Sequence, residues 1–255
     1  MCRFVAYLGP AITLEALLLE PEHSLLRQSW APRHQRHGTV NADGFGAGWY
    51  DAARRPEPAR YRTARPMWTD RSFTSLAGLV TSGAVLAAVR SATPPAPVDE
   101  SGAPPFTSGC WLFAHNGAVE GFHDTPGIEL RGQVSARARA GIEGASDAEL
   151  LFALALDRLH AGASMGGALV EVITAVERVT SGRLNLVITD GESVVATAVG
   201  DSLFVRRGDG VVVASEPFDD HGCWQAVPDR SLVEARPDDV VITSLGDETA
   251  LGGTS

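Results

Sequence analysis

The stretch RLNLVITDGESVVATAVG, residues 183–200, decides the fold because it carries a clear hairpin signal. Two runs rich in β-branched residues flank Asp190-Gly191, and an Asp-Gly pair in this position is typical of a tight antiparallel turn. The pattern repeats directly afterwards, where SLFVRR (202–207) and VVVAS (211–215) flank Asp209-Gly210. The sequence therefore predicts antiparallel sheet for this part of the chain.

Two helices are expected immediately before these hairpins. Residues 147–160 and 165–180 carry apolar side chains at helical spacing, and Ser146-x-x-Glu149 is a capping box at the start of the first helix. Further strands are expected over residues 2–8, 44–50, 59–64, 83–90, 110–117 and 238–244. Because regular alternation of strands and helices is absent, the order favours an α+β fold with two antiparallel sheets and helices outside them.

The other segments are interpreted as short helices and connections. Thr13 is expected to cap a helix over 14–20 that Pro21 ends, and another helix is expected near 70–81. Loops are predicted for residues 21–43, 91–109 and 124–145, and a flexible tail for about 247–255. We expect residues 1–255 to form a single domain.

The composition excludes several classes of function. The chain has 255 residues, a formal net charge of -10, and Arg at all 21 of its basic positions. The lack of Lys excludes Schiff-base chemistry and a Walker A site, and the acidic balance argues against nucleic acid as a partner. Three cysteines without a C-x-x-C pair predict no disulfide framework. No apolar segment is long enough for a membrane span. A reducing cytoplasm and a small-molecule partner are expected.

Cys2 is the most informative candidate for catalysis. The small side chain after Met1 is of the type whose initiator methionine is commonly removed, and removal leaves a cysteine with a free α-amine. The reference pKa of an α-amine is ~7.7–8.0, so one residue can supply both the nucleophile and its base. The alternative is a small buried residue that begins a strand.

The tripeptide His115-Asn116-Gly117 follows an apolar run. The side-chain amide of Asn116 and a backbone N–H at Gly117 are two donors that can converge on one oxyanion. Asn-Gly is also a preferred hairpin turn, so the alternative is a strand that ends here in a β-turn.

Arg90 and Asp147 are candidates for binding charged groups. Arg90 ends an apolar run, and its planar guanidinium can form a bidentate pair with a carboxylate. Asp147, at the start of the expected helix, can hold an ammonium group. The alternatives are a structural ion pair for Arg90 and a favourable helix-dipole contact for Asp147.

Other side chains carry weaker signals. His34-x-x-His37 has the spacing of a metal pair, but a solvated basic loop accounts for it better because no third ligand stands out. The sequence therefore predicts neither a metal nor a cofactor. Trp30, Trp49 and His37 could contact the part of a substrate that leaves.

The candidates combine into one kind of recognition. The site would offer a thiol with its own amine, a pair of oxyanion donors, a guanidinium for a carboxylate and a carboxylate for an ammonium. These groups suit a substrate that has a free α-amino acid group and is cut at an amide in its side chain. A γ-glutamyl amide has this shape.

The sequence resembles the class II glutamine amidotransferases, which are N-terminal-nucleophile hydrolases. The motifs that carry the resemblance are Cys2, NADGFGAGWY (41–50), VRSAT (89–93), FAHNGAV (113–119), SDAE (146–149) and ASEP (214–217). The resemblance implies a four-layer αββα sandwich with Cys2 as nucleophile. It further implies that Asn116 and Gly117 form the oxyanion hole, that Arg90 and Asp147 hold the glutamate α-carboxylate and α-amine, and that His115 belongs to the substrate site.

Two differences from the synthases of this family narrow the expected activity. The chain opens CRFVAYLG rather than Cys-Gly-Ile, and no synthase domain follows in the 255 residues. Residues 23–50 are similar to stand-alone members that remove glutamate from a sulfoxide intermediate of ergothioneine biosynthesis. A glutaminase subunit that delivers ammonia to a separate synthase, and an inactive binding scaffold, are the alternatives. The oligomeric state is left open.

Overall fold

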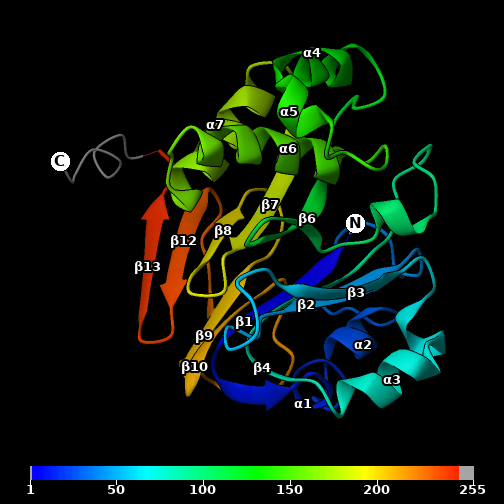
Figure 1. Cartoon of the computed structure of the whole chain (residues 1–255), viewed down its shortest axis with the longest axis vertical. Coiled ribbons are helices and arrows are strands. Elements are labelled where there is room, and N and C mark those ends of the chain that lie inside the picture. Colours follow the sequence, from blue (N-terminus) through cyan, green and yellow to red (C-terminus); the bar gives the residue numbers. More distant parts are fainter. Residues whose placement is uncertain (1, 247–255) are drawn as a thin grey trace.

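Antiparallel pairing arranges the strands in two sheets, which Figure 1 shows one above the other. The computed structural model describes residues 2–246, so Met1 and the tail expected at 247–255 lie outside the described residues. The first sheet has the order β11-β9-β10-β1-β4-β2-β3. Its strands are β1 (Arg3–Thr13), β2 (Phe45–Trp49), β3 (Ala59–Thr63), β4 (Thr81–Val89), β9 (Phe204–Gly208), β10 (Gly210–Ala214) and β11 (Trp224–Ala226).

The second sheet has the order β13-β12-β8-β7-β6-β5. Its strands are β5 (Phe106–Ser108), β6 (Trp111–Val119), β7 (Gly182–Thr189), β8 (Val194–Ala198), β12 (Ser231–Arg236) and β13 (Asp239–Ser244). The two hairpins expected from Asp190-Gly191 and Asp209-Gly210 are β7–β8 and β9–β10, and the positive φ angles of Gly191 and Gly210 suit these turns.

Helices cover the outer face of each sheet (Figure 1). The second sheet is covered by α4 (Thr125–Gln133), α5 (Ala136–Arg139), α6 (Asp147–His160) and α7 (Met165–Glu177). The first sheet is covered by α1 (Leu14–Leu18), α2 (Leu25–Gln28) and α3 (Arg71–Ala77). Two short 3₁₀ helices, η1 (Met67–Thr69) and η2 (Glu100–Gly102), lie in connections.

Alternation along β1 explains why the molecule has four layers. Phe4, Ala6 and Leu8 are buried in the apolar core between the two sheets, whereas Val5 and Tyr7 are buried in the core between the first sheet and its helices. Successive side chains of a strand point to opposite faces, so a strand that is apolar throughout must be covered on both sides. The expected αββα sandwich is confirmed.

Most expected elements are present, with shifted ends. The helix expected at 147–160 is α6, whose Ser146 hydroxyl accepts a hydrogen bond from the Glu149 N–H at 3.2 Å. Thr13 caps α1 by accepting from the Ala16 N–H at 3.1 Å. The strand expected at 2–8 continues to Thr13, with a register shift between Leu8 and Ile12.

Four expectations are wrong. The loop predicted for 91–109 contains η2 and β5. The loop predicted for 124–145 contains α4 and α5, which the sequence conceals because Gly127, Gly132 and charged residues interrupt the apolar pattern. The loop predicted for 21–43 contains α2. The strand that begins near Cys110 does not end in a turn at Asn116-Gly117 but continues through both residues to Val119, paired with β7.

Within residues 2–246, the structure contains no helix that is both long and apolar enough to cross a membrane.

The pairing also brings distant parts of the chain together. Arg3 at the start of β1 is opposite Val89 at the end of β4, so Cys2 lies next to the end of the strand that precedes Arg90. In the second sheet, Asn116 of β6 is opposite Asn185 of β7. The two sheets thus present these strand ends at one edge of the sandwich.

Candidate active site

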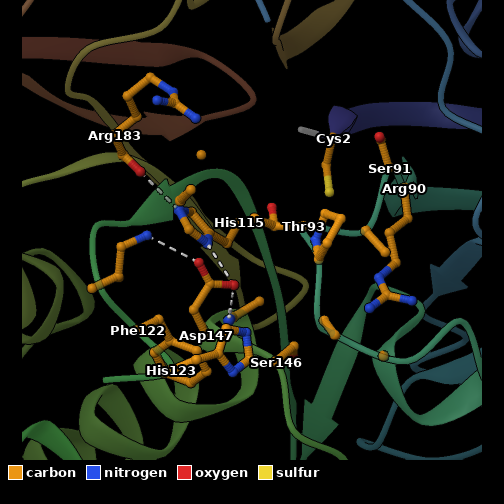
Figure 2. A pocket seen from close by; sticks show the side chains of 18 of the residues that line it. Cys2, Arg90, Ser91, Thr93, His115, Phe122, His123, Ser146, Asp147 and Arg183 are labelled. Atoms are coloured by element: carbon orange, nitrogen blue, oxygen red, sulfur yellow. Dashed lines mark hydrogen bonds and ion pairs between the residues drawn. The ribbon is translucent and has the colours of Figure 1, made fainter. Parts of the chain in front are cut away.

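A cavity of about 540 Å³ opens at this edge and contains five of the six candidate residues (Figure 2). Its lining includes Cys2, Arg90, His115, Gly117 and Asp147. The sixth candidate, Asn116, is fully buried beside it. Residues separated by more than a hundred positions therefore meet at one site, and their roles can be judged from their contacts.

Asn116 contacts the backbone of Cys2. Its Oδ1 accepts a hydrogen bond from the Cys2 backbone nitrogen at 3.2 Å. Because the oxygen faces this nitrogen, Nδ2 is the other end of the amide, and it is buried with no hydrogen-bond partner among the described residues. An unpaired buried donor costs free energy of roughly 1–3 kcal/mol, so a group that accepts from it is expected in the working site.

Gly117 lies where no side chain fits. A Cβ at this position would lie 1.8 Å from the carbonyl oxygen of Arg183 and 2.6 Å from Nε2 of His115. Glycine here lets β6 approach β7 closely and leaves the backbone facing the cavity bare. Glycine is therefore needed at position 117 because of contacts with distant residues, and not because the chain turns there.

Asp147 joins the start of α6 to the end of β6. Its Oδ2 accepts from the Val119 N–H at 3.0 Å, and its Oδ1 accepts from the Ala148 N–H at 2.8 Å. His115 lies behind it, with Nδ1 3.9 Å from Asp147 Oδ1 and Nε2 2.9 Å from the Arg183 carbonyl oxygen. These contacts fix a carboxylate on the cavity wall, as a site for an ammonium group requires.

Arg90 is almost fully buried, with 5% of its surface exposed, and is held by carbonyl oxygens. Nη1 and Nη2 each lie 3.2 Å from the Pro97 oxygen, and Nη1 lies 3.4 Å from the Asp43 oxygen. The segment that follows Arg90 packs tightly against it, since a Cβ at Gly102 would lie 2.6 Å from Nη2. The charge of Arg90 helps to lower the pKa of Asp99, but among the described residues no carboxylate forms an ion pair with the guanidinium, so the site suits an anionic group.

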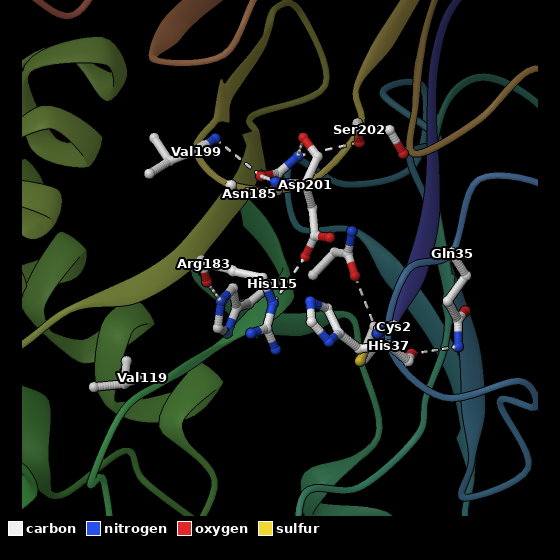
Figure 3. A network of polar contacts seen from close by, with 12 residues as sticks. Cys2, Gln35, His37, His115, Val119, Arg183, Asn185, Val199, Asp201 and Ser202 are labelled. Atoms are coloured by element: carbon white, nitrogen blue, oxygen red, sulfur yellow. Dashed lines mark hydrogen bonds and ion pairs between the residues drawn. The ribbon is translucent and has the colours of Figure 1, made fainter.

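Arg183, which the sequence analysis missed, also lines the cavity. Its Nε lies 3.3 Å from Oδ2 of Asp201, whose side chain is 1% exposed. Figure 3 shows this pair beside Asn185, which donates from Nδ2 to the Asp201 carbonyl at 3.0 Å and accepts at Oδ1 from the Asp201 N–H at 3.2 Å. The available signal was an Arg directly before the apolar run LNLVIT, the mirror image of Arg90 after its run.

Arg3 and Glu216 hold the segment 33–41 close to Cys2. Glu216 is fully buried and accepts from the N–H groups of Arg33 at 3.0 Å and His34 at 2.7 Å. Arg3, also fully buried, donates from Nε to Gln35 Oε1 at 3.3 Å. Burial lowers the pKa of the Arg3 guanidinium, while the nearby charges of Glu216 and Asp201 act in the opposite direction.

The weaker candidates do not join the site. Trp30 packs edge-on against Trp68, with ring centroids 5.9 Å apart, and Trp49 packs against the core beneath the first sheet. The His34 ring contacts Phe204 at 5.0 Å. Trp30, Trp49 and His37 are all absent from the cavity lining, so the expectation that they contact the substrate is not supported by their positions.

Within residues 2–246, one group of possible metal ligands lies outside the cavity. Ligand atoms of Glu22, His23 and Asp220 lie within 4.8 Å of one another near the surface. Arg33 Nη1 already donates to Asp220 Oδ1 at 2.7 Å, so the Arg33 guanidinium neutralises the carboxylate of Asp220.

Known proteins resemble the chain along nearly its whole length. It is 42% identical over 248 residues to a γ-glutamyl-hercynylcysteine sulfoxide hydrolase of Mycobacterium tuberculosis, covering 96% of this chain and 97% of that one. It is 43% identical over 249 residues to the protein of the same name from Mycolicibacterium smegmatis, covering 96% and 100%.

A solved structure agrees with the fold. A class II glutamine aminotransferase domain protein from Silicibacter pomeroyi is 26% identical, with a TM-score of 0.71 over 96% of this chain and 99% of that one. Residues 21–209 match the family described as class II glutamine amidotransferases. Together with the extensive likeness to the mycobacterial hydrolases, this match shows that the chain belongs to the class II glutamine amidotransferase family.

Proposed function

We propose that the chain hydrolyses a γ-glutamyl amide bond with Cys2 as nucleophile, and that it releases glutamate from γ-glutamyl-hercynylcysteine sulfoxide in ergothioneine biosynthesis. The observation that carries the chemistry is the Asn116 amide, which contacts the Cys2 nitrogen through Oδ1 and has a buried Nδ2 with no partner in residues 2–246. The mycobacterial hydrolases of that name, similar over 96% of the chain, support the substrate.

The reaction begins at the amino terminus that removal of Met1 creates. The α-amine of Cys2, oriented by Asn116 Oδ1, takes the thiol proton directly or through a water. The thiolate sulfur then bonds to the γ-carbonyl carbon, and the carbonyl electrons move to oxygen. Asn116 Nδ2 and the N–H of Gly117 stabilise that oxyanion.

Collapse of this intermediate breaks the C–N bond. The leaving nitrogen takes the proton from the Cys2 ammonium and departs as a neutral amine, and the glutamyl group remains as a thioester. Water then attacks the thioester carbon, with the Cys2 α-amine as base, and glutamate is released with the thiol restored.

Two charged residues anchor the glutamyl end. The guanidinium of Arg90 binds the α-carboxylate, and the fixed carboxylate of Asp147 binds the α-ammonium. His115, between Asp147 and the Arg183 carbonyl, holds Asp147 in place. We expect the reaction to take place in a reducing cytoplasm, because Cys2 must remain a free thiol.

The test compares two substrates and two cysteines. We expect purified protein to hydrolyse the γ-glutamyl sulfoxide conjugate much faster than glutamine, and Cys2→Ala to abolish both activities. Cys110→Ala is the matched control because the Cys110 thiol is not part of the cavity lining. Hydrolysis by Cys2→Ala at the wild-type rate would overturn the mechanism. A preference for glutamine would instead favour the ammonia-delivering glutaminase.

A further inference from the structure

The cavity contains a second guanidinium that the glutamyl end of the substrate does not need. Figure 2 places the guanidinium groups of Arg90 and Arg183 on opposite sides of the Cys2 sulfur, with the carboxylate of Asp147 between them in this view. With the glutamyl α-carboxylate and α-ammonium bound to Arg90 and Asp147, the leaving group extends from the reacting carbon toward Arg183.

The carboxylates near the Arg183 guanidinium are those of Asp201 and Glu120. The buried carboxylate of Asp201 contacts Arg183 Nε at 3.3 Å, and the nearest further carboxylate oxygen is that of Glu120, 3.9 Å from Nη1. The Glu120 side chain is 61% exposed, so its hold on Arg183 is weak. The backbone of Arg183 is fixed as well, because its carbonyl accepts from His115 Nε2 at 2.9 Å. The terminal nitrogens are thus positioned for a further anionic partner at the cavity.

The chemistry of the leaving group identifies that partner. When glutamine is cut, ammonia leaves and has no charge for a guanidinium to bind. When the amide joins glutamate to an amino acid, the leaving nitrogen is attached to the α-carbon, which bears a carboxylate one bond further on. A planar guanidinium binds such a carboxylate through two parallel N–H donors.

We infer that Arg183, positioned by Asp201, binds the α-carboxylate of the amino acid that is released, and so selects γ-glutamyl amino-acid conjugates over glutamine. This inference rests on the proposed function and specifies the substrate class of the same site. It also accounts for a buried carboxylate, Asp201, that the hydrolytic steps do not use.

The test uses two probes that differ only at this carboxylate. γ-Glutamyl-S-methylcysteine sulfoxide carries it, and the corresponding carboxamide does not. For the wild-type protein we expect kcat/KM to be roughly 10–100-fold higher for the carboxylate probe, the range of a charge-assisted hydrogen-bonded pair. In Arg183→Gln this ratio should fall to about one, and in Arg183→Lys to an intermediate value. Asp201→Asn should also lower the ratio.

Arg158→Gln is the matched control, because Arg158 forms an exposed ion pair with Glu171 on the helical layer. Equal kcat/KM values for the two probes in the wild-type protein would overturn the inference and leave the proposed function intact. An unchanged ratio in folded Arg183→Gln would also overturn it. If the wild-type protein hydrolyses neither probe, the proposed function fails and the inference fails with it.

Discussion

The proposed mechanism gives the Asn116 side chain two functions. Its oxygen orients the Cys2 nitrogen, and its buried NH₂ group has no partner among the described residues. A residue that offered only an acceptor would keep the first function and lose the second. The amide can therefore be dissected by an isosteric substitution.

Asn116→Asp provides this dissection. The variant keeps an oxygen for the Cys2 nitrogen but replaces the oxyanion donor with an acceptor, so we expect kcat for the γ-glutamyl conjugate to fall at least about 10²–10³-fold. Steady-state kinetics measure the loss, and alkylation of Cys2 by iodoacetamide controls for an intact nucleophile. A loss below tenfold in a protein that alkylates normally would contradict the donor role.

At the scale of elements, substitutions of two glycines test how closely β6 packs against β7 and how open the surface of α4 is. A Cβ at Gly117 would meet the Arg183 carbonyl at 1.8 Å, whereas a Cβ at Gly132 of α4 meets nothing within 4 Å. We expect Gly117→Ala to lower the free energy of unfolding by at least ~1–3 kcal/mol, because the strands must separate. Gly132→Ala should raise it by ~0.4–1 kcal/mol, because alanine restricts the unfolded chain and favours helix.

Urea unfolding of both variants measures these free energies. Unchanged stability of Gly117→Ala would show that the strands have room that the structure does not give them. Destabilisation by Gly132→Ala would contradict the open environment on α4.

The same elements explain what the sequence could predict. The hairpins and α6 follow from local chemistry, because Asp-Gly turns and the Ser146 cap act within a few residues. The course of β6 through Gly117 depends on a carbonyl of β7, which is distant in sequence. No local pattern distinguishes that glycine from one in a turn.

At the scale of the whole molecule, stability should depend on the ionisation of Glu149. Its Oε1 accepts from the N–H groups of Glu143 and Gly144, while Oε2 is buried without a partner among the described residues. Burial raises the pKa of this carboxyl above its ordinary value, against the effect of the two N–H groups. The folded chain thus keeps this proton to higher pH than the unfolded chain does.

The free energy of unfolding should therefore decrease as the pH rises from the ordinary carboxyl pKa through the raised one. In Glu149→Gln this contribution disappears, because the amide keeps an acceptor oxygen but does not ionise. Urea unfolding at several pH values measures the slope, with Glu171→Gln on the exposed side of α7 as the control. A wild-type slope that Glu149→Gln leaves unchanged would contradict this account.

For the site, too, some residues could be predicted from local sequence and others depend on contacts between distant parts of the chain. Cys2, Asn116 and Asp147 could be proposed from the sequence because each has chemistry of its own beside a strand or a cap. Asp201 could not, and Arg183 had only its place before the run LNLVIT as a signal, since the relevance of both depends on the pairing of β6 with β7 and on burial. The single domain expected for residues 1–255 stays a prediction, which the core shared by both sheets supports.

The hydrogen bonds between Glu216 and the segment 33–41 have a consequence for which side chains this segment can carry. Its carboxylate binds main-chain N–H groups, those of Arg33 and His34, and takes no account of the side chains they carry. The side chains at these two positions can therefore change without loss of either hydrogen bond. Only proline, which has no N–H to offer, is barred from these two positions.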